Sequence, residues 1–440
     1  MEAELNHTHD AARQSWLPAA SAAGTAFPLQ NLPYAVFRRK DSTEPFRGGV
    51  AIGDQIVDLA ALREAGCLHG LAADAATAAA GQTLNAFFEM GPPAWRVLRH
   101  ALFGLLERGS PHEAMVRPCL LPQALAEYAV PTRIGDYTDF YTSLDHAVNC
   151  SKPLGLAVTP NFDWLPIAYH GRASSIGVSG QAVRRPVGQY RVEGVAHPVA
   201  GPCQRLDYEL ELGIFIGTGN AQGTPIDIAQ AQRHVFGICL LNDWSARDIQ
   251  GWEMQPLGPF QSKNFATTIS PWIVTLEALL PYRQPWRRAA GRPLPLPYLD
   301  APGNDAAGAF DIRLEVAVQS ASRAARGLPA ATLTRTSFRH QYWSIAQMIA
   351  HHTVGGCNLQ AGDLLGSGTI SGPTPGEAGA LIELTVAGTQ PVDIGAGEMR
   401  GFLEDGDSVI FSGWCERAGY ARIGFGTNHG KILPARHVGA

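Results

Sequence analysis

The sequence predicts a mainly β protein of the α+β class, with a small N-terminal unit followed by a larger domain. Its 440 residues exceed the size at which a single hydrophobic core usually stops growing, so two domains are expected. With 45% hydrophobic and 17% charged residues, the composition is that of a globular protein with a sizeable core. After Pro131 the chain holds many short apolar runs separated by Gly and Pro, which is typical of a β domain.

The first part of the chain is expected to mix strands and helices. Residues 1–16 are polar and aperiodic, which predicts a mobile tail, and residues 17–130 form the N-terminal unit. Within it, Gly53-Asp54 separates two apolar runs and predicts a hairpin turn. The Ala-rich and Leu-rich stretches 71–80 and 94–106 predict helices. The linker to the next domain is marked by Pro118, Pro122 and Pro131.

Residues 131–440 form the second domain. The apolar runs 314–318 and 408–411 predict strands in it. A helix is expected over 342–352, because four apolar or aromatic positions there recur at helical spacing and Gly355-Gly356 follows as a stop.

The bulk composition argues against several classes of partner. A net charge of −5 gives no reason to expect nucleic acid or an anionic membrane. The seven cysteines include no C-x-x-C pair, which suits reduced thiols inside a cell better than disulfides or a zinc site. The sequence shows neither a signal peptide nor an apolar run of the ~20 residues that span a bilayer. We therefore expect a soluble, cytoplasmic protein.

Four acidic residues stand in stretches otherwise built for burial. They are Asp139, Glu209, Glu211 and Asp243. Carboxylates are seldom buried unless they are paired or bind a metal, and oxygen ligands favour a hard cation such as Ca²⁺ or Mg²⁺. In a strand, Glu209 and Glu211 share one face. The alternative is a half-buried strand with a solvated acidic face.

The segment 243–250 predicts a short helix that begins after an acidic residue. Ser245 and Asp248 resemble a capping pair, and Arg247 and Gln250 fall on one helical face. Such an arrangement builds a polar pocket; the alternative is a capped helix with an Asp243–Arg247 ion pair.

Three further residues are candidates for chemistry. Lys263, between two phenylalanines, could hold a developing negative charge in a dry site, or else extend its ammonium into water. His146 is a candidate general base, although one histidine among fourteen is more often structural. Glu383 lies within an apolar run that predicts a strand, where it could orient a histidine or simply face outward.

Several motifs, in the same order, resemble the fumarylacetoacetase family. The resemblance extends from Asn31 to Pro434 and rests on the segments 136–141 with His146, 169–175, 209–211, 242–250 and 368–373.

The resemblance implies a fold, an assembly and an activity. The fold is a small SH3-like barrel followed by a mixed β-sandwich/roll catalytic domain, assembled as a homodimer. The activity is metal-dependent hydrolysis of the carbon–carbon bond of 4-fumarylacetoacetate to fumarate and acetoacetate, the last step of tyrosine and phenylalanine catabolism. The alternatives are hydrolysis of another acylpyruvate or β-diketone, or a catalytically silent metal-binding protein.

The resemblance also implies residue roles. Ca²⁺ or Mg²⁺ would bind Asp139, Glu209, Glu211 and Asp243, and a second cation would lie near Asp243, Lys263 and Thr267. His146 would be the base, oriented by Glu383. Arg247, Gln250 and Lys263 would stabilise the departing carbanion. The expected substrate contacts are Tyr141, Tyr169, Gln250, Met254 and Thr369.

Two positions depart from the family pattern. Members usually carry tyrosine at the position of Met254. They also carry a substrate-facing arginine between His146 and Tyr169, where the loop 150–156 of this chain is shorter and has none. Both departures affect contacts to the substrate's carboxylates.

Overall fold

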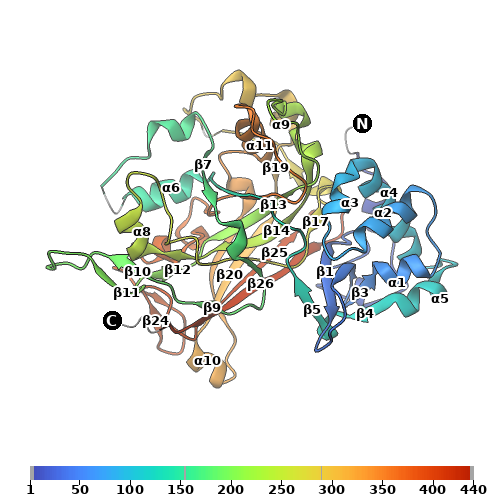
Figure 1. The fold of residues 1–440 in the computed structure, drawn as a ribbon, viewed down its shortest axis with the longest axis horizontal. Coiled ribbons are helices and arrows are strands. Elements are labelled where there is room, and N and C mark those ends of the chain that lie inside the picture. Colours follow the sequence, from blue (N-terminus) through green and yellow to red (C-terminus); the bar gives the residue numbers. More distant parts are fainter. Residues whose placement is uncertain (1–3, 153–154, 289, 437–440) are drawn as a thin grey trace.

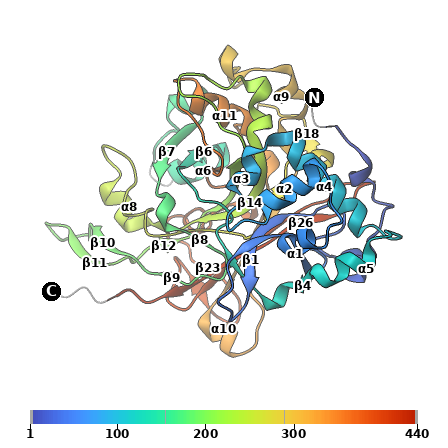
Figure 2. The same cartoon turned by 45° about the vertical axis from the view of Figure 1, so that its right-hand side comes forward.

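A computed structural model of the chain describes residues 4–152, 155–288 and 290–436. Both views place the N-terminal unit at one side of the larger second unit, while the hairpin of β10 (Val187–Tyr190) and β11 (Val199–Pro202) projects at the opposite side (Figures 1 and 2). Within the described ranges, none of the helices is both long enough and apolar enough to cross a membrane.

The N-terminal unit is a curled five-stranded antiparallel sheet, a β-rich half-barrel, covered by helices. The strands follow the order β4-β3-β2-β1-β5. Their bounds are β1 (Tyr34–Arg39), β2 (Arg47–Ile52), β3 (Gln55–Asp58), β4 (Leu120–Pro122) and β5 (Ala126–Ala129). The helices are α1 (Leu59–Glu64), α2 (Leu71–Ala79), α3 (Asn85–Glu89), α4 (Gly91–Leu106) and α5 (Glu113–Val116).

The local predictions for this unit are confirmed with small shifts. The β2–β3 hairpin turns at Gly53, whose φ of +56° is one that glycine adopts readily. Helix α2 coincides with the predicted 71–80 to within one residue. Helix α4 begins three residues before the predicted 94, because Pro92 and Pro93 fit its first turn, where the N–H groups have no helical partner.

The segment expected to be a mobile tail is instead packed over residues 4–16. Thr8 is fully buried, His9 Nε2 lies 2.8 Å from the Glu277 carbonyl oxygen, and Ser15 Oγ donates to the Leu106 carbonyl oxygen at 2.7 Å. These contacts join polar side chains to residues far along the chain. A polar, aperiodic pattern cannot reveal such partners; residues 1–3 lie outside the described ranges.

The second unit is a sandwich of two sheets. The larger, eight-stranded sheet follows the order β7-β6-β22-β13-β14-β16-β8, with β17 also paired to β14. Its strands are β6 (Tyr137–Tyr141), β7 (Ile167–Gly171), β8 (Ile176–Val178), β13 (Leu210–Ile216), β14 (Val235–Asp243), β16 (Thr267–Ile269), β17 (Val274–Thr275) and β22 (Leu364–Gly366). The second sheet, in the order β21-β20-β25-β26-β9, contains β9 (Val183–Arg184), β20 (Arg313–Gln319), β21 (Ala331–Ser337), β25 (Ser408–Cys415) and β26 (Ile423–Leu433).

Short elements complete the second unit. The helices are α6 (Leu144–Ser151), α7 (Ile228–Ala231), α8 (Arg247–Glu253), α9 (Pro302–Ala307), α10 (Ala321–Ala325), α11 (Ile345–Thr353) and α12 (Leu381–Leu384). The remaining strands are β12 (Leu206–Asp207), β15 (Ser245–Ala246), β18 (Arg283–Gln284), β19 (Ala309–Phe310), β23 (Val392–Asp393) and β24 (Met399–Arg400). The predicted strands at 314–318 and 408–411 lie in β20 and β25. The helix predicted at 342–352 is α11, which starts later because Ser344 caps it.

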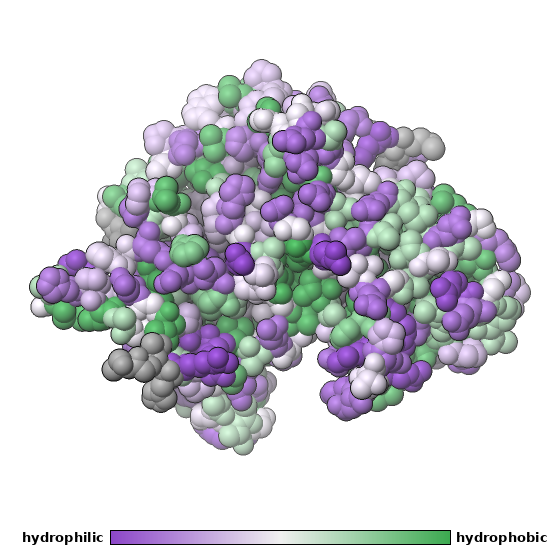
Figure 3. Space-filling model, in the orientation of Figure 1, coloured by the Kyte–Doolittle hydropathy of each residue, from purple (hydrophilic) through white to green (hydrophobic). Residues whose placement is uncertain are grey.

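Side chains alternate between the two faces of β13, and this alternation determines which of them face the site. Leu210, Leu212 and Ile214 belong to the core between the two sheets, whereas Phe215 packs in the core shared with the N-terminal unit. At that contact Phe236 of β14 stacks on Phe88 of α3, with ring centroids 4.0 Å apart. The N-terminal unit therefore covers part of the outer face of the larger sheet, which is also the face of Glu211. Hydrophobic residues gather near the centre of the view in Figure 3, at the inner end of the recess between the two units.

Candidate active site

The four predicted acids meet at the large sheet. Asp139 lies on β6, Glu211 on β13, Asp243 at the end of β14, and Glu209 just before β13. One oxygen of each carboxylate lies within 4.8 Å of one from every other. Glu209 is 6% exposed and Glu211 is fully buried, so the alternative of a solvated acidic face is excluded.

The negative charge of this cluster is not compensated at Asp139 and Glu211. Burial, together with Asp243, raises the pKa of Asp139 well above its usual value, and burial with Asp139 does the same for Glu211. Asp139 Oδ1 and Glu211 Oε1 accept no hydrogen bond from the described residues. Buried carboxylate oxygens without donors are the chemistry of a hard divalent cation site, so the residues present fit Ca²⁺ or Mg²⁺.

Gly366 leaves the room that the cluster needs. A Cβ atom at this position would lie 2.6 Å from Asp139 Oδ1 and 3.0 Å from Glu211 Oε2. Two residues on, the Gly368 N–H donates to Glu211 Oε2 at 3.0 Å, from a backbone with φ +73°. Gly366 was not among the predicted site residues; the signal for it was the Gly-Ser-Gly sequence that follows Leu364 and Leu365.

Lys263 lies inside the cluster rather than in solvent. Its Nζ donates to Glu209 Oε2 and, at 2.6 Å, to Asp243 Oδ2, and the side chain is 7% exposed. Thr267 Oγ1 donates to Asp243 Oδ1 at 2.9 Å. Burial lowers the pKa of Lys263, but Asp243 and Glu209 outweigh it and raise the pKa above its usual value. A protonated ammonium has no lone pair, so Lys263 is a counter-ion here, and only its main-chain oxygen could serve a second cation.

Arg247 is held from two sides and keeps one free edge. Its Nε donates to Asp207 Oδ2 at 2.8 Å, and Nη1 lies 2.7 Å from Glu209 Oε1 and 3.2 Å from Gln250 Oε1. The shared face of Arg247 and Gln250 is therefore confirmed. Nη2 is buried without a partner among the described residues, which leaves a donor for a bound molecule.

Two local expectations for this segment are wrong. Asp243 does not pair with Arg247, whose carboxylate partners are Asp207 and Glu209. Ser245 and Asp248 do not cap the helix, because Ser245 extends as β15 and α8 begins only after Ala246. Ser245 Oγ donates to the Asp243 carbonyl oxygen, and Asp248 accepts from the Gln204 N–H at 2.7 Å.

His146 and Glu383 are in direct contact. His146 Nδ1 lies 2.7 Å from Glu383 Oε1, and both side chains are nearly inaccessible. Glu383 also accepts from Asn149 Nδ2 and Ser371 Oγ, each at 2.9 Å. Sequence reasoning missed Asn149 and Ser371, since a supporting amide or hydroxyl leaves no pattern of its own. Glu383 lies on the short helix α12 and not on the predicted strand, because a short apolar run does not distinguish a strand from a buried helix.

The histidine's second nitrogen faces away from Glu383. Cys150 Sγ lies 3.7 Å from His146 Nε2, and the Tyr141 ring is 5.3 Å from the imidazole. Burial lowers the pKa of His146, but Cys150 and Glu383 act against it and raise the pKa well above its usual value. With Nδ1 engaged by Glu383, Nε2 is the nitrogen that can exchange a proton with a bound molecule.

The expected substrate-contact residues differ in burial and in their contacts with the acidic cluster. Tyr169 donates its hydroxyl to Asp243 Oδ2 at 3.0 Å, and burial raises the pKa of Tyr141 to about 12, so both hydroxyls remain protonated near neutral pH. Thr369 is buried directly after Gly368. Met254 follows α8 and is 46% exposed. Of the loop 150–156, residues 153 and 154 lie outside the described ranges.

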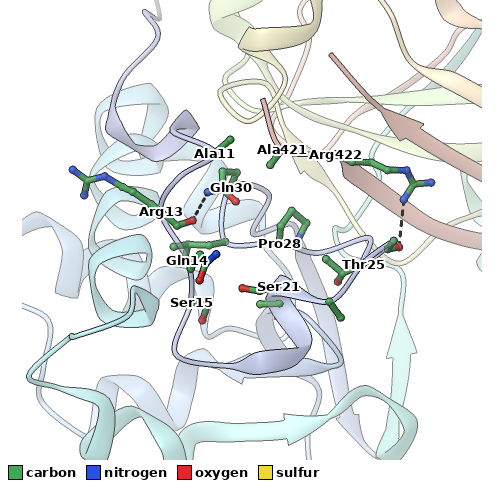
Figure 4. Close-up of a pocket in the computed structure, with 14 residues that line it drawn as sticks. Ala11, Arg13, Gln14, Ser15, Ser21, Thr25, Pro28, Gln30, Ala421 and Arg422 are labelled. Atoms are coloured by element: carbon green, nitrogen blue, oxygen red, sulfur yellow. Dashed lines mark hydrogen bonds between the residues drawn. The ribbon is translucent and has the colours of Figure 1, made fainter. Parts of the chain in front are cut away.

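A cavity of about 210 Å³ lies elsewhere, between the N-terminal segment and residues 421–422. Its lining includes Gln14, Ser15 and Ser21 but none of the candidate site residues. The guanidinium groups of Arg13 and Arg422 point away from it (Figure 4). It is separate from the acidic cluster and carries none of the chemistry described above.

Comparison with known proteins defines the class and then the family. Residues 137–429 match the family described as fumarylacetoacetate (FAA) hydrolase C-terminal, and residues 30–131 match fumarylacetoacetase N-terminal. The chain is 46% identical over 423 residues to the fumarylacetoacetase of Oryza sativa subsp. japonica, covering 94% of this chain and 96% of that protein. It is 47% identical to that of Arabidopsis thaliana (93% and 96% covered) and 45% identical to that of Homo sapiens (96% and 99% covered). The chain belongs to the fumarylacetoacetase family.

The space beside Gly366 makes a testable prediction for cation binding. Gly366→Ala should weaken Ca²⁺ or Mg²⁺ binding by about 5–150-fold, because overpacking of about 1–3 kcal/mol displaces the Asp139 and Glu211 carboxylates. Isothermal titration calorimetry on metal-depleted protein measures the affinity. Gly376→Ala, where an added Cβ meets open space, is the matched control. Equal affinities in both variants would contradict the assigned role of Gly366.

Proposed function

We propose that this chain hydrolyses the carbon–carbon bond of 4-fumarylacetoacetate to fumarate and acetoacetate, the last step of tyrosine and phenylalanine catabolism. The observation that carries the proposal is the His146–Glu383 contact, whose imidazole acts electrostatically on Glu209 of the buried acidic cluster. Relatives that bear the name fumarylacetoacetase align over nearly its whole length and support the substrate. The substrate is thus a small β-diketo acid.

The acidic cluster would hold the catalytic cation, Ca²⁺ or Mg²⁺. Asp139, Glu209, Glu211 and Asp243 are its proposed ligands, and a second cation near Asp243, Lys263 and Thr267 remains a prediction. When bound, the cation supplies Lewis acidity that polarises the diketone oxygens.

His146 is proposed as the general base. In the neutral form of the imidazole, Nε2 accepts a proton from water, and the hydroxide so formed attacks the carbonyl carbon, while the Glu383 carboxylate stabilises the imidazolium that results. The hydrogen bonds from Asn149 and Ser371 fix Glu383 in place. When the carbon–carbon bond breaks, the proton held on Nε2 is available to the departing carbanion.

The cationic side of the site is proposed to stabilise the negative charge that develops on the leaving group. Arg247 Nη2 is a buried donor without a partner among the described residues, and Lys263 brings a desolvated ammonium. Gln250 bonds to Arg247 and holds it in position. Tyr141, Tyr169 and Thr369 are proposed to contact the substrate.

One observation favours a second candidate, a hydrolase of another acylpyruvate or β-diketone. Met254 offers no hydrogen bond where family members usually have a tyrosine hydroxyl, and the loop 150–156 has no arginine. A less polar substrate tail would fit these departures. A catalytically silent metal-binding protein is disfavoured, because the His146–Glu383 pair has no purpose in such a protein.

Assembly and location complete the proposal. The loop after α8 exposes Leu257 (96%) and Phe260 (67%), which supports a homodimer in which such side chains find a partner. All seven cysteines are free thiols, the state that a reducing cytoplasm maintains. Sedimentation of the purified protein measures the oligomeric state.

Removal of the metal should abolish activity. Chelation and dialysis are expected to eliminate hydrolysis, followed as loss of the substrate's ultraviolet absorbance, and to lower the melting temperature. A cation that binds only the folded state adds about 2.7 kcal/mol at a hundredfold excess over its Kd. Re-addition of Ca²⁺ or Mg²⁺ should restore both readouts. Full activity in protein shown by elemental analysis to be metal-free would rule out metal dependence.

Loss of the base should remove chemistry but not metal. His146→Ala is expected to lower kcat by about 10²–10⁴-fold, the usual contribution of a general base, with cation affinity retained. Glu383→Gln should lower kcat less severely, because the imidazole loses its charged partner. His351→Ala is the control, since that histidine bonds Tyr298 away from the site. A near-normal kcat in His146→Ala would assign the base to another group.

Met254 tests the substrate preference. Met254→Tyr should improve kcat/KM for fumarylacetoacetate by about 10–100-fold, mainly through KM, since a hydrogen bond to a charged group adds about 1.5–3 kcal/mol. Leu257→Tyr, on the same exposed loop, is the control. If Met254→Tyr matches the parent, and the parent already prefers fumarylacetoacetate to less polar diketones, the altered-specificity interpretation fails.

A further inference from the structure

Asp207 is a buried carboxylate that lies beside the metal cluster and takes no part in it. It is fully inaccessible, at the end of β12, where it pairs with Ser245 of β15. Oδ1 accepts from the N–H groups of Tyr208 and Leu381, both at 2.8 Å, and Oδ2 accepts from Arg247 Nε at 2.8 Å and the Ile382 N–H at 3.1 Å. All four acceptor positions of the carboxylate are thus in use.

Apart from the N–H of the adjacent Tyr208, the donors to Asp207 belong to two different parts of the site. Arg247 carries Nη2, which is buried without a partner among the described residues and is the donor proposed to stabilise the leaving group. Leu381 and Ile382 are the first two residues of α12, and the next residue is Glu383, which holds His146. One carboxylate therefore joins the arginine on β15–α8 to the short helix behind the base.

We propose that Asp207 is a positioning residue that sets the orientation of Arg247 and of the Glu383–His146 pair together, so that the charge-stabilising side and the base side of the site keep a fixed relation. This inference rests on the proposed hydrolase function.

The geometry separates this role from that of a metal ligand. Asp139 and Glu211 each keep an oxygen without a donor, as a ligand would, whereas Asp207 has none to spare. The Asp207–Arg247 contact engages Nε, and Glu209 and Gln250 engage Nη1. The guanidinium plane is thereby fixed, and Nη2 is the edge left to face a substrate.

The same carboxylate also orients α12. That helix has only four residues, and Ala380, which precedes it, offers no side-chain cap. The Leu381 and Ile382 N–H groups, the first two of the helix, donate to Asp207 and so gain partners that the helix itself cannot supply. A displacement of this turn would move Glu383 directly, and an error of about 1 Å in a catalytic group can cost roughly a hundredfold in rate.

The test compares Asp207→Asn with Asp363→Asn. Asp363 is also buried (3% exposed) and accepts from the N–H groups of Asp136 and Gln360, but it contacts no cationic side chain among the residues that the structure describes. Asp207→Asn should lower kcat about 10–100-fold with KM and cation affinity changed little, because both positioned groups act on the reacting atoms. Asp363→Asn should keep kcat within about threefold, whatever it loses in stability.

Two double-variant cycles test whether both parts of the site are involved. Adding Asp207→Asn to Glu383→Gln, and separately to Arg247→Ala, should lower kcat by less than it does in the parent, because the partner it positions is already impaired. Full multiplicativity in either cycle would show that Asp207 does not act through that partner, and the coupled role would fail.

The outcomes separate this inference from the proposed function. A parent enzyme without turnover of fumarylacetoacetate contradicts the function itself. An active parent whose Asp207→Asn variant keeps its kcat contradicts only the role of Asp207. If Asp207→Asn does not fold, Asp207→Glu, which keeps the charge but shifts it by one methylene, is expected to show the same loss of kcat. Failure of both variants to fold assigns Asp207 to stability alone and overturns the proposal.

Discussion

The mutual repulsion of four buried carboxylates is the constraint on which the rest of the site depends. Lys263 and Arg247 compensate the side formed by Glu209 and Asp243, and although burial raises the pKa of Glu209, these two cations bring it below its usual value. Over the described ranges, the side formed by Asp139 and Glu211 has no such partner and holds oxygens without donors. A divalent cation on that side would resolve the imbalance, and it would also supply what the proposed chemistry needs.

The sheet topology brings the carboxylates together and confines them to one face of the large sheet. Parallel pairing of β22 with β6 and antiparallel pairing of β22 with β13 bring Asp139 and Glu211 together across Gly366. The opposite face of β13 remains apolar and builds the sandwich core. The N-terminal unit packs on the outer face at Phe215 and Phe236, so the acids lie in a protected region of a face that is otherwise a domain contact.

Much of this arrangement was predictable from local pattern, and the remainder depends on pairing across long sequence distances. The period of two predicts that Glu209 and Glu211 share a face, and their carboxylates do meet; helical spacing likewise brings Arg247 to Gln250. The pairing of Arg247 with Asp207 was not predictable, because the β12–β15 register brings these two residues together. Likewise, the apolar residues around Glu383 predicted a strand, whereas its turn is held by hydrogen bonds to Asp207 from outside the segment.

The most direct test of the account removes one charge from the cluster in metal-free protein. Glu211→Gln keeps the size of the side chain and an oxygen for the Gly368 N–H while relieving the repulsion. Because burial and the neighbouring acids raise the pKa of Glu211, its ionised form destabilises the fold near neutral pH. The account predicts that the metal-free variant melts at a higher temperature than the metal-free parent, and that Ca²⁺ or Mg²⁺ no longer raises the melting temperature. A variant that melts lower without metal and still gains stability from the cation would contradict it.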